Sequence, residues 1–253
     1  MKINKFKKIG TNKYKIFFDN HTLTIYEDVI LKYNLLYKKE VDSDLLLQIN
    51  EDNYKASIYD TALKYINIRM RSIKEMYEYL LKKGYDTDNI NDTIEKLLSQ
   101  NLLNDTSFCK SYINDKINLT NSGLDKIKNE LLKLGIEEDI IDESFNNIDK
   151  SILNDKLKKI IDKELKINSK LPVIKLKNKI INRCINLGYT YESINEILNN
   201  INITTNSNIK KDYDVYYKKY KSKYEGYKLE TFIKSKLYQK GYSSEEINKI
   251  CEN

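Results

Sequence analysis

"LLKKGY" at residues 80–85 is the first of four similar stretches in which a glycine follows an apolar, helix-like run. The others are "LLKLGI" (131–136), "CINLGY" (184–189) and "LYQKGY" (237–242). Their glycines are Gly84, Gly135, Gly188 and Gly241. The separations of 51, 53 and 53 residues are close to a fixed period. A helix that ends in the left-handed conformation favours glycine there, because glycine has no Cβ to clash. The pattern therefore predicts a helix end that recurs four times.

Apolar residues keep fixed offsets from these glycines. An isoleucine stands six positions after each, and apolar residues stand four and eight positions before each. These offsets place one apolar stripe on a helix before the glycine and another on a helix after it. Asp86, Thr190 and Ser243 offer oxygens that can cap the later helix, whereas Glu137 is a poorer cap. Each copy therefore predicts a helix, a tight turn and a second helix.

A further helix is predicted before each pair. The stretches with helical apolar spacing are residues 57–70, 105–117, 154–165 and 212–224. Ser72 and Glu75 have capping-box spacing, which marks a break between the first two helices of the first copy. Small units of this kind gain stability by stacking on their neighbours. The expected fold is mainly α: tandem three-helix repeats in an elongated, curved array.

The first 53 residues differ from the repeats. "KYKIFF" (13–18) and "TLTIY" (22–26) alternate apolar and polar residues around a turn, which predicts a β-hairpin. Two short helical segments follow the hairpin. A lone hairpin is marginal in water, so it should lean on the first repeat or on further strands. The expected divisions are 1–53 for this extension and 54–104, 105–153, 154–207 and 208–253 for repeats 1 to 4.

Composition narrows the class of protein. The chain has 253 residues, 40% hydrophobic and 32% charged, with a net charge of +7. That charge is compatible with an acidic partner such as nucleic acid, and equally with a solvated lysine surface. Three widely spaced cysteines without a CxxC pair favour a reducing cytoplasm over a disulfide framework or a zinc site. We expect no export signal and no membrane segment, because no apolar run is long enough.

Motifs for catalysis are lacking. The single histidine, His21, lies among turn-forming residues, which favours a hairpin tip over a catalytic role. The sequence has neither G-x-G-x-x-G nor G-x-x-x-x-G-K-[ST], so no nucleotide-binding loop is predicted. We therefore expect no enzyme, no catalytic or metal-binding residues and no cofactor.

Residues 60–145 carry a more specific pattern, which closely resembles the core of the RecX regulatory protein family. The matching residues are Ala62, Leu63, Arg69, Arg71, Ser72, Glu75, Leu80, Gly84, Tyr85, Leu103, Asp105, Phe108, Tyr112, Gly123, Glu130, Leu131, Gly135 and Ile136. Over residues 150–253 the likeness lies in the repeat alone, and the third copy lacks the Arg-x-Arg-Ser element. Shorter family members resemble three such repeats, whereas this chain has four and an N-terminal hairpin.

This resemblance implies a modulator of the RecA recombinase. Such a protein binds in the groove of the RecA–DNA filament and mostly inhibits its recombinase, ATPase and coprotease activities. We expect a monomer whose partner is the RecA nucleoprotein filament, with further contacts to the phosphates of single- or double-stranded DNA. The alternative is a helical-repeat protein that binds DNA directly, without RecA. A scaffold for another protein partner is a third hypothesis.

Cationic side chains are the candidate contacts to RecA or DNA. They are Arg69, Arg71, Lys82, Lys83, Lys110, Lys116, Lys126, Lys156, Lys158, Lys159, Lys163, Lys175, Lys177 and Lys179. For the two arginines, a structural role at a helix junction competes evenly with a contact role. Residues 150–185 hold eleven Lys/Arg and three Asp/Glu, and an acidic stretch (136–149) precedes them. The lysines there form a phosphate-facing stripe, pair with the acidic stretch or are simply solvated.

The tyrosine-rich stretch "YDVYYKKYKSKYEGYK" (213–228) is a candidate for stacking on single-stranded bases. Its tyrosines recur every three or four residues, which is the spacing of one helical stripe. Core packing with the hydroxyls near water is the favoured interpretation.

Overall fold

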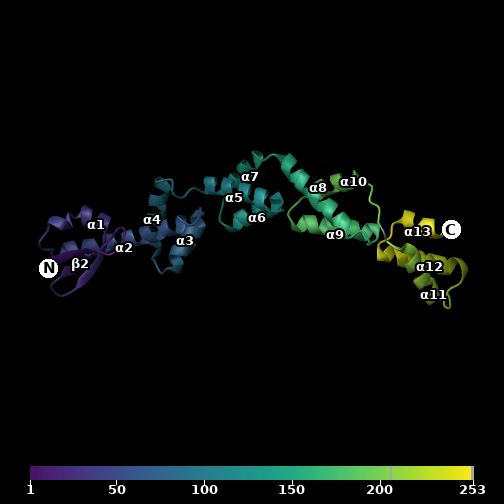
Figure 1. Ribbon diagram of the computed structural model, residues 1–253, viewed down its shortest axis with the longest axis horizontal. Helices are drawn as coiled ribbons and strands as arrows, with labels where there is room; N and C mark the ends of the chain where they lie inside the picture. The colour runs from purple at the N-terminus through teal and green to yellow at the C-terminus, as the bar shows by residue number, and fades with distance from the viewer. Residues whose placement is uncertain (206, 252–253) are drawn as a thin grey trace. The chain divides into compact units, whose positions relative to one another are not determined.

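The computed structural model describes residues 1–205 and 207–251. Within them the protein is mainly α-helical, with a three-stranded antiparallel sheet near the N-terminus (Figure 1). The chain forms two compact units, Met1–Lys110 with Leu132–Ile140, and Ser111–Leu131 with Ile141–Asn253. The mainly α fold with a small β extension is confirmed, whereas the elongated, curved course of the array stays a prediction.

The N-terminal sheet has one strand more than the predicted hairpin. Its strands are β1 (Ile3–Lys8), β2 (Lys13–Phe18) and β3 (Thr22–Tyr26), in the order β1-β2-β3. β2 and β3 form the expected hairpin, in which Ile16 is paired with Leu23. The missed strand, β1, has lysine at half of its positions and buries no side chain fully, so it gives a weak strand signal.

Two helices cover the sheet and one of them enters the first repeat. They are α1 (Glu27–Lys32) and α2 (Ser43–Ile66), with a short 3-10 turn, η1 (Leu35–Tyr37), between them. Ile16, Ile25 and Ile30 are buried in the core below these helices. The expected division after residue 53 falls inside α2, because residues 43–66 contain neither glycine nor proline to end the helix.

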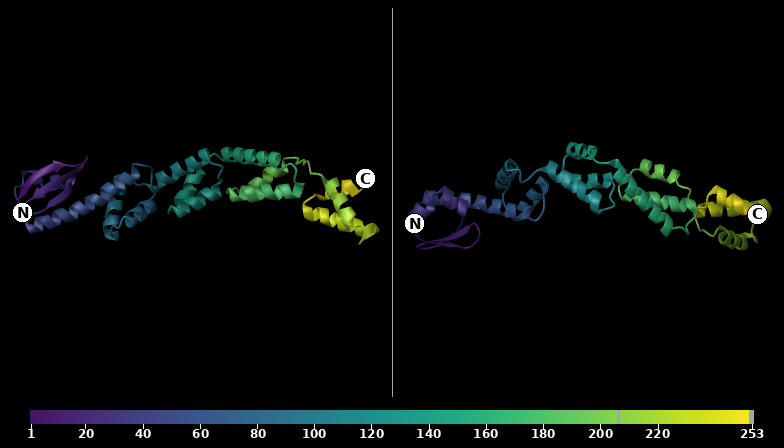
Figure 2. Two further views of the ribbon diagram at one scale, coloured as in Figure 1. Left: turned by 60° about the horizontal axis from the view of Figure 1, so that its bottom comes forward. Right: turned by 45° about the horizontal axis from the view of Figure 1, so that its top comes forward.

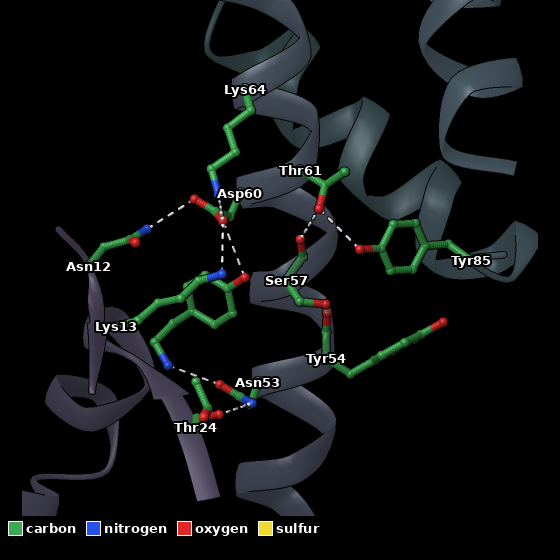
Figure 3. A network of polar contacts seen from close by, with 11 residues as sticks. Asn12, Lys13, Thr24, Asn53, Tyr54, Ser57, Asp60, Thr61, Lys64 and Tyr85 are labelled. Carbon is green, nitrogen blue, oxygen red and sulfur yellow. Dashed lines mark hydrogen bonds and ion pairs between the residues drawn. The ribbon is translucent and has the colours of Figure 1, made fainter. Parts of the chain in front are cut away.

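A buried carboxylate joins the sheet to α2 (Figure 3). Asp60 accepts hydrogen bonds from Lys64 Nζ (2.8 Å), Asn12 Nδ2 (3.2 Å) and Tyr26 Oη (3.2 Å). Lys13 Nζ lies 3.4 Å away as an ion pair. Burial raises the pKa of Asp60, but the bonds from Lys64 and Asn12 outweigh it and hold that pKa below its usual value. The N-terminal extension is therefore held to the first repeat by polar contacts as well as by its apolar core.

The remaining helices follow in groups of three, as the glycine spacing predicts. They are α3 (Ile73–Lys82), α4 (Thr87–Ser99), α5 (Asp105–Leu119), α6 (Leu124–Lys133), α7 (Glu138–Asn146), α8 (Lys150–Ile167), α9 (Val173–Asn186), α10 (Tyr191–Asn199), α11 (Ile209–Tyr220), α12 (Gly226–Lys240) and α13 (Ser244–Cys251). With α2 as the first helix, the groups are α2–α4, α5–α7, α8–α10 and α11–α13. Figure 2 shows the groups from two further sides, with α8 beside α9 in both views.

The apolar offsets form the repeat cores. Around Gly188 the predicted positions Ile180, Cys184 and Ile194 are fully buried, and the corresponding positions in the other repeats are buried as well. The predicted caps are also confirmed. Ser72 and Glu75 form a capping box at the start of α3, and Asp86 accepts from the amide of Asn89 at the start of α4.

Candidate functional site

Each turn glycine after the first lies against the start of the second helix of the preceding repeat. We call this contact the joint. In the first unit, a Cβ on Gly135 would lie 2.7 Å from the Cβ of Lys74 in α3. There Ser72 Oγ donates to the carbonyl of Leu134 (2.7 Å), and Lys74 Nζ donates to that of Lys133 (3.0 Å). The end of α6 therefore supplies the acceptors for the start of α3.

The second unit contains two further joints. A Cβ on Gly188 would lie 2.4 Å from the backbone nitrogen of Lys126 in α6, and one on Gly241 would lie 2.9 Å from the Cβ of Lys175 in α9. Gly123, which the sequence did not single out as a joint residue, lies on the other side of the first of these. A Cβ there would lie 2.2 Å from the carbonyl oxygen of Gly188.

Backbone hydrogen bonds cross both joints of the second unit. The amides of Gly123 and Asp125 donate to the carbonyls of Leu187 (2.6 Å) and Gly188 (3.1 Å). The amide of Ile174 donates to the carbonyl of Gly241 (3.1 Å). The first amides and last carbonyls of an α-helix have no partner inside the helix. A joint satisfies both sets at once and aligns the two helix dipoles head to tail.

This geometry explains the glycine period in two ways. Gly135, Gly188 and Gly241 have φ values of +83°, +87° and +101°, in the left-handed region. They also leave no room for a Cβ. Gly84 has φ of +86° as well, but no described residue lies within 4 Å of its ideal Cβ. The first glycine therefore ends a helix without forming a joint with any described residue.

The two candidate arginines have different surroundings. The guanidinium of Arg71 lies 3.7 Å from the ring centroid of Tyr65, and its Nε donates to the carbonyl of that residue (3.3 Å). With an exposure of 9%, Arg71 packs within the first repeat. Arg69 is ion-paired with Glu75, but about half of its side chain is exposed. Arg69 therefore remains the better contact candidate of the two.

The candidate lysines divide by exposure. The exposed ones are Lys82, Lys83, Lys110, Lys158, Lys159, Lys163, Lys175 and Lys179, and the half-buried ones are Lys116, Lys126, Lys156 and Lys177. Lys156 Nζ donates to the carbonyls of Ile117 and Thr120 near the end of α5. Lys116 forms an ion pair of 2.6 Å with Glu130. The exposed lysines of the third repeat lie on two neighbouring helices, α8 and α9. Lys116 and Lys156 instead form contacts inside the second unit.

The tyrosine stripe packs into the fourth repeat in part. Tyr213, Tyr216 and Tyr220 lie against its apolar core, as the favoured interpretation predicts. Tyr217, Tyr224 and Tyr227 depart from this pattern, because they are 44%, 37% and 82% exposed. The rings of Tyr224 and Phe232 stack on each other, with 4.9 Å between their centroids.

Other kinds of site find little support in the part of the chain that the structure describes. His21 stacks on Phe18 at the tip of the hairpin, with 4.8 Å between the ring centroids. Residues 1–205 and 207–251 contain no group of three or more histidine, cysteine or acidic side chains that could hold a metal ion. None of the helices described there has the length and apolarity needed to cross a membrane.

Comparison with known proteins identifies the repeats. The family model of the first three-helix domain of RecX matches residues 59–97, and that of the second matches residues 104–144. Two crystal structures are similar. One, described as regulatory protein RecX, has a TM-score of 0.67 at 22% identity, over 78% of this chain and 98% of its own. RecX from Lactobacillus salivarius has a TM-score of 0.55 at 25% identity, over 58% of this chain and 95% of its own.

Curated relatives match over nearly the whole chain. Regulatory protein RecX of Streptococcus pyogenes serotype M3 is 31% identical over 98% of this chain and 97% of its own length. The protein of the same name from Lactococcus lactis subsp. lactis is 30% identical over 97% of this chain and 94% of its own. The likeness thus extends over the N-terminal sheet and all four repeats, beyond the two domains that the family models match. The chain belongs to the RecX family of regulatory proteins.

Proposed function

We propose that the protein binds in the groove of the RecA–DNA filament and restrains the recombinase, ATPase and coprotease activities of RecA. The observation that carries this proposal is membership of the RecX family over almost the full length of the chain. No catalytic centre is needed for such a role, because binding to one state of a polymer is enough to shift its activity.

The joints supply a physical reason why the repeats suit a polymeric partner. Each joint fixes the second helices of two neighbouring repeats against each other through glycine contacts. Exposed cations then recur along the chain, at Lys82 and Lys83 in the first repeat and at Lys158, Lys159 and Lys163 in the third. Contacts that are weak one by one become strong when a single chain presents them together to repeated subunits.

The test is the DNA-dependent ATP hydrolysis of RecA on single-stranded DNA. We expect the protein to reduce the hydrolysis rate at or below one copy per RecA subunit. A variant with Lys158, Lys159 and Lys163 changed to glutamate should need a higher concentration for the same effect. The matched control changes three exposed lysines of the edge strand (Lys5, Lys7 and Lys8) to glutamate. An unchanged hydrolysis rate at saturating protein would refute the proposal.

Direct DNA binding is the second candidate, and the cationic surplus of residues 150–185 favours it. A protein that neutralises phosphates loses affinity steeply as the salt concentration rises. If this candidate is right, fluorescence anisotropy with labelled DNA should give tight, salt-dependent binding that RecA does not alter. Binding to DNA that appears only when RecA is present supports the filament instead.

A further inference from the structure

The joint has two sides, and each side is left unoccupied once within the described residues. One is the turn at Gly84, which is exposed, and no described residue lies within 4 Å of its ideal Cβ position. The other is the start of α12 in the fourth repeat, against which no turn among the described residues lies. Within the described residues, the first repeat therefore presents an unoccupied turn and the fourth repeat an unoccupied receiving surface.

The start of α12 matches the start of α9, which is occupied. Lys228 stands as far before Gly241 as Lys175 stands before Gly188. At α9 the N-cap residue, Pro172, makes no side-chain hydrogen bond, and the amide of the helix is satisfied across the joint instead. At α12 the N-cap residue is Glu225, which also makes no side-chain hydrogen bond. The counterpart of the Gly241 carbonyl is missing there among the described residues.

The same surface carries an apolar hollow. A pocket of about 370 Å³ opens at the first two turns of α12. Its lining residues are Tyr224, Tyr227, Lys228, Thr231, Phe232 and Ser235. Water satisfies the exposed amides at this helix start, so the apolar lining of the pocket favours a covering group and the amides set how that group is oriented.

We propose that a second copy of this chain covers the pocket with its Gly84 turn and so extends the series of joints from one molecule to the next. In this contact the carbonyl of Gly84 accepts the amide of Tyr227, as the carbonyl of Gly241 accepts the amide of Ile174. The α-carbon of Gly84 lies against Lys228, where a Cβ would not fit. The contact is heterologous, since a turn on one copy meets a helix start on the other, so it adds copies in a row. The monomer expected from the sequence then prevails at low concentration.

Two thiol variants of the full chain test this arrangement. Lys83→Cys places a thiol beside the Gly84 turn, and Lys228→Cys places one at the receiving surface. Both are made in a Cys251→Ser background, so that the half-buried native thiol does not react. A short bis-maleimide should link the two variants when they are mixed at high concentration. Neither variant alone should give more than a trace of dimer, because each lacks the partner thiol.

Sedimentation velocity gives an independent readout. The sedimentation coefficient of the unmodified chain should rise with concentration, and Lys228→Trp should abolish that rise by filling the receiving surface. Lys218→Trp, an exposed substitution on α11, is the control and should leave the rise unchanged. A sedimentation coefficient that does not depend on concentration would overturn the proposal. So would efficient crosslinking of either variant with itself, because that result indicates a symmetric contact.

Discussion

Three glycine-to-alanine substitutions separate the two roles that the joints assign to glycine. Gly84 combines a left-handed φ of +86° with open space. Gly123 has no left-handed φ, but its ideal Cβ position lies 2.2 Å from the carbonyl oxygen of Gly188. Gly188 combines a φ of +87° with an ideal Cβ position that lies only 2.4 Å from the backbone nitrogen of Lys126. Alanine therefore tests the backbone conformation alone at Gly84, the close contact alone at Gly123, and both together at Gly188.

The expected costs differ in size. At Gly84 alanine should cost about 1–2 kcal/mol, the usual penalty for a left-handed residue. At Gly123 the neighbour is backbone, so the joint must open or shift. Overpacking costs roughly 1–3 kcal/mol, and two strained backbone hydrogen bonds add about 0.5–1.5 kcal/mol each. Gly188→Ala carries both penalties and should be the most destabilising of the three.

Urea unfolding followed by far-ultraviolet circular dichroism measures the total loss of stability. Hydrogen exchange then locates it, because the amide of Gly123 donates to Leu187 and should lose protection in Gly123→Ala and Gly188→Ala. In Gly84→Ala that amide should stay protected, since Gly84 lies in the first unit. Equal losses for Gly84→Ala and Gly188→Ala would refute the packing argument and leave the φ requirement as the sole role of the glycines.

Three further predictions concern buried groups. Tyr189→Phe should be neutral or slightly stabilising in thermal unfolding, because the buried hydroxyl of Tyr189 has no hydrogen-bond partner among the described residues. Tyr242→Phe removes a bond of 2.6 Å to Asp212 and should cost about 1–3 kcal/mol, and equal effects of the two substitutions would contradict this. The pKa of Asp60 is lowered in the folded protein, so its carboxylate stabilises the fold above pH about 4, the pKa of an aspartate in the unfolded chain, and this stabilisation is lost as the pH falls further. The N-terminal sheet should therefore lose protection from hydrogen exchange in acid, and Asp60→Asn should show a flatter pH profile. Burial raises the pKa of Cys184 to about 11, so at pH near 8 a thiol reagent should label it at the rate of unfolding, and rapid labelling in the native protein would show that the site is open.

The repeat architecture is predictable from the sequence because one constraint acts four times. Gly188 with Ile180, Cys184 and Ile194 shows how a left-handed turn and an apolar stripe reinforce each other, and the structure buries all three apolar residues. The continuity of α2 was not predicted. The sequence suggested a division after residue 53, but a change in apolar pattern ends no helix without a capping or breaking residue. Strand β1 was not predicted because its lysines mask the alternation of apolar and polar residues.

The contacts that form the joints could not be predicted from the sequence. Gly123 is followed by helix-forming residues, and nothing near it indicates that its α-carbon meets Gly188 in the next repeat. Arg71 illustrates the same limit for the candidate contacts. The sequence left a structural role and a contact role equally open for Arg69 and Arg71, and the structure covers the guanidinium of Arg71 with the ring of Tyr65. Distant residues decide which cations stay exposed, and their positions depend on tertiary packing rather than on local spacing.

The joints also have a direction, and this limits how such a chain can change in length. Every joint presents hydrogen-bond donors on the side of the earlier repeat and carbonyls on the side of the later one. The donors are backbone amides in the second unit and the side chains of Ser72 and Lys74 in the first. A duplicated or deleted repeat therefore restores a complete joint without any new complementary surface. A repeat inserted in reverse would set donors against donors and carbonyls against carbonyls. Gain and loss of whole repeats in a single orientation is the evolutionary path that this backbone geometry leaves open.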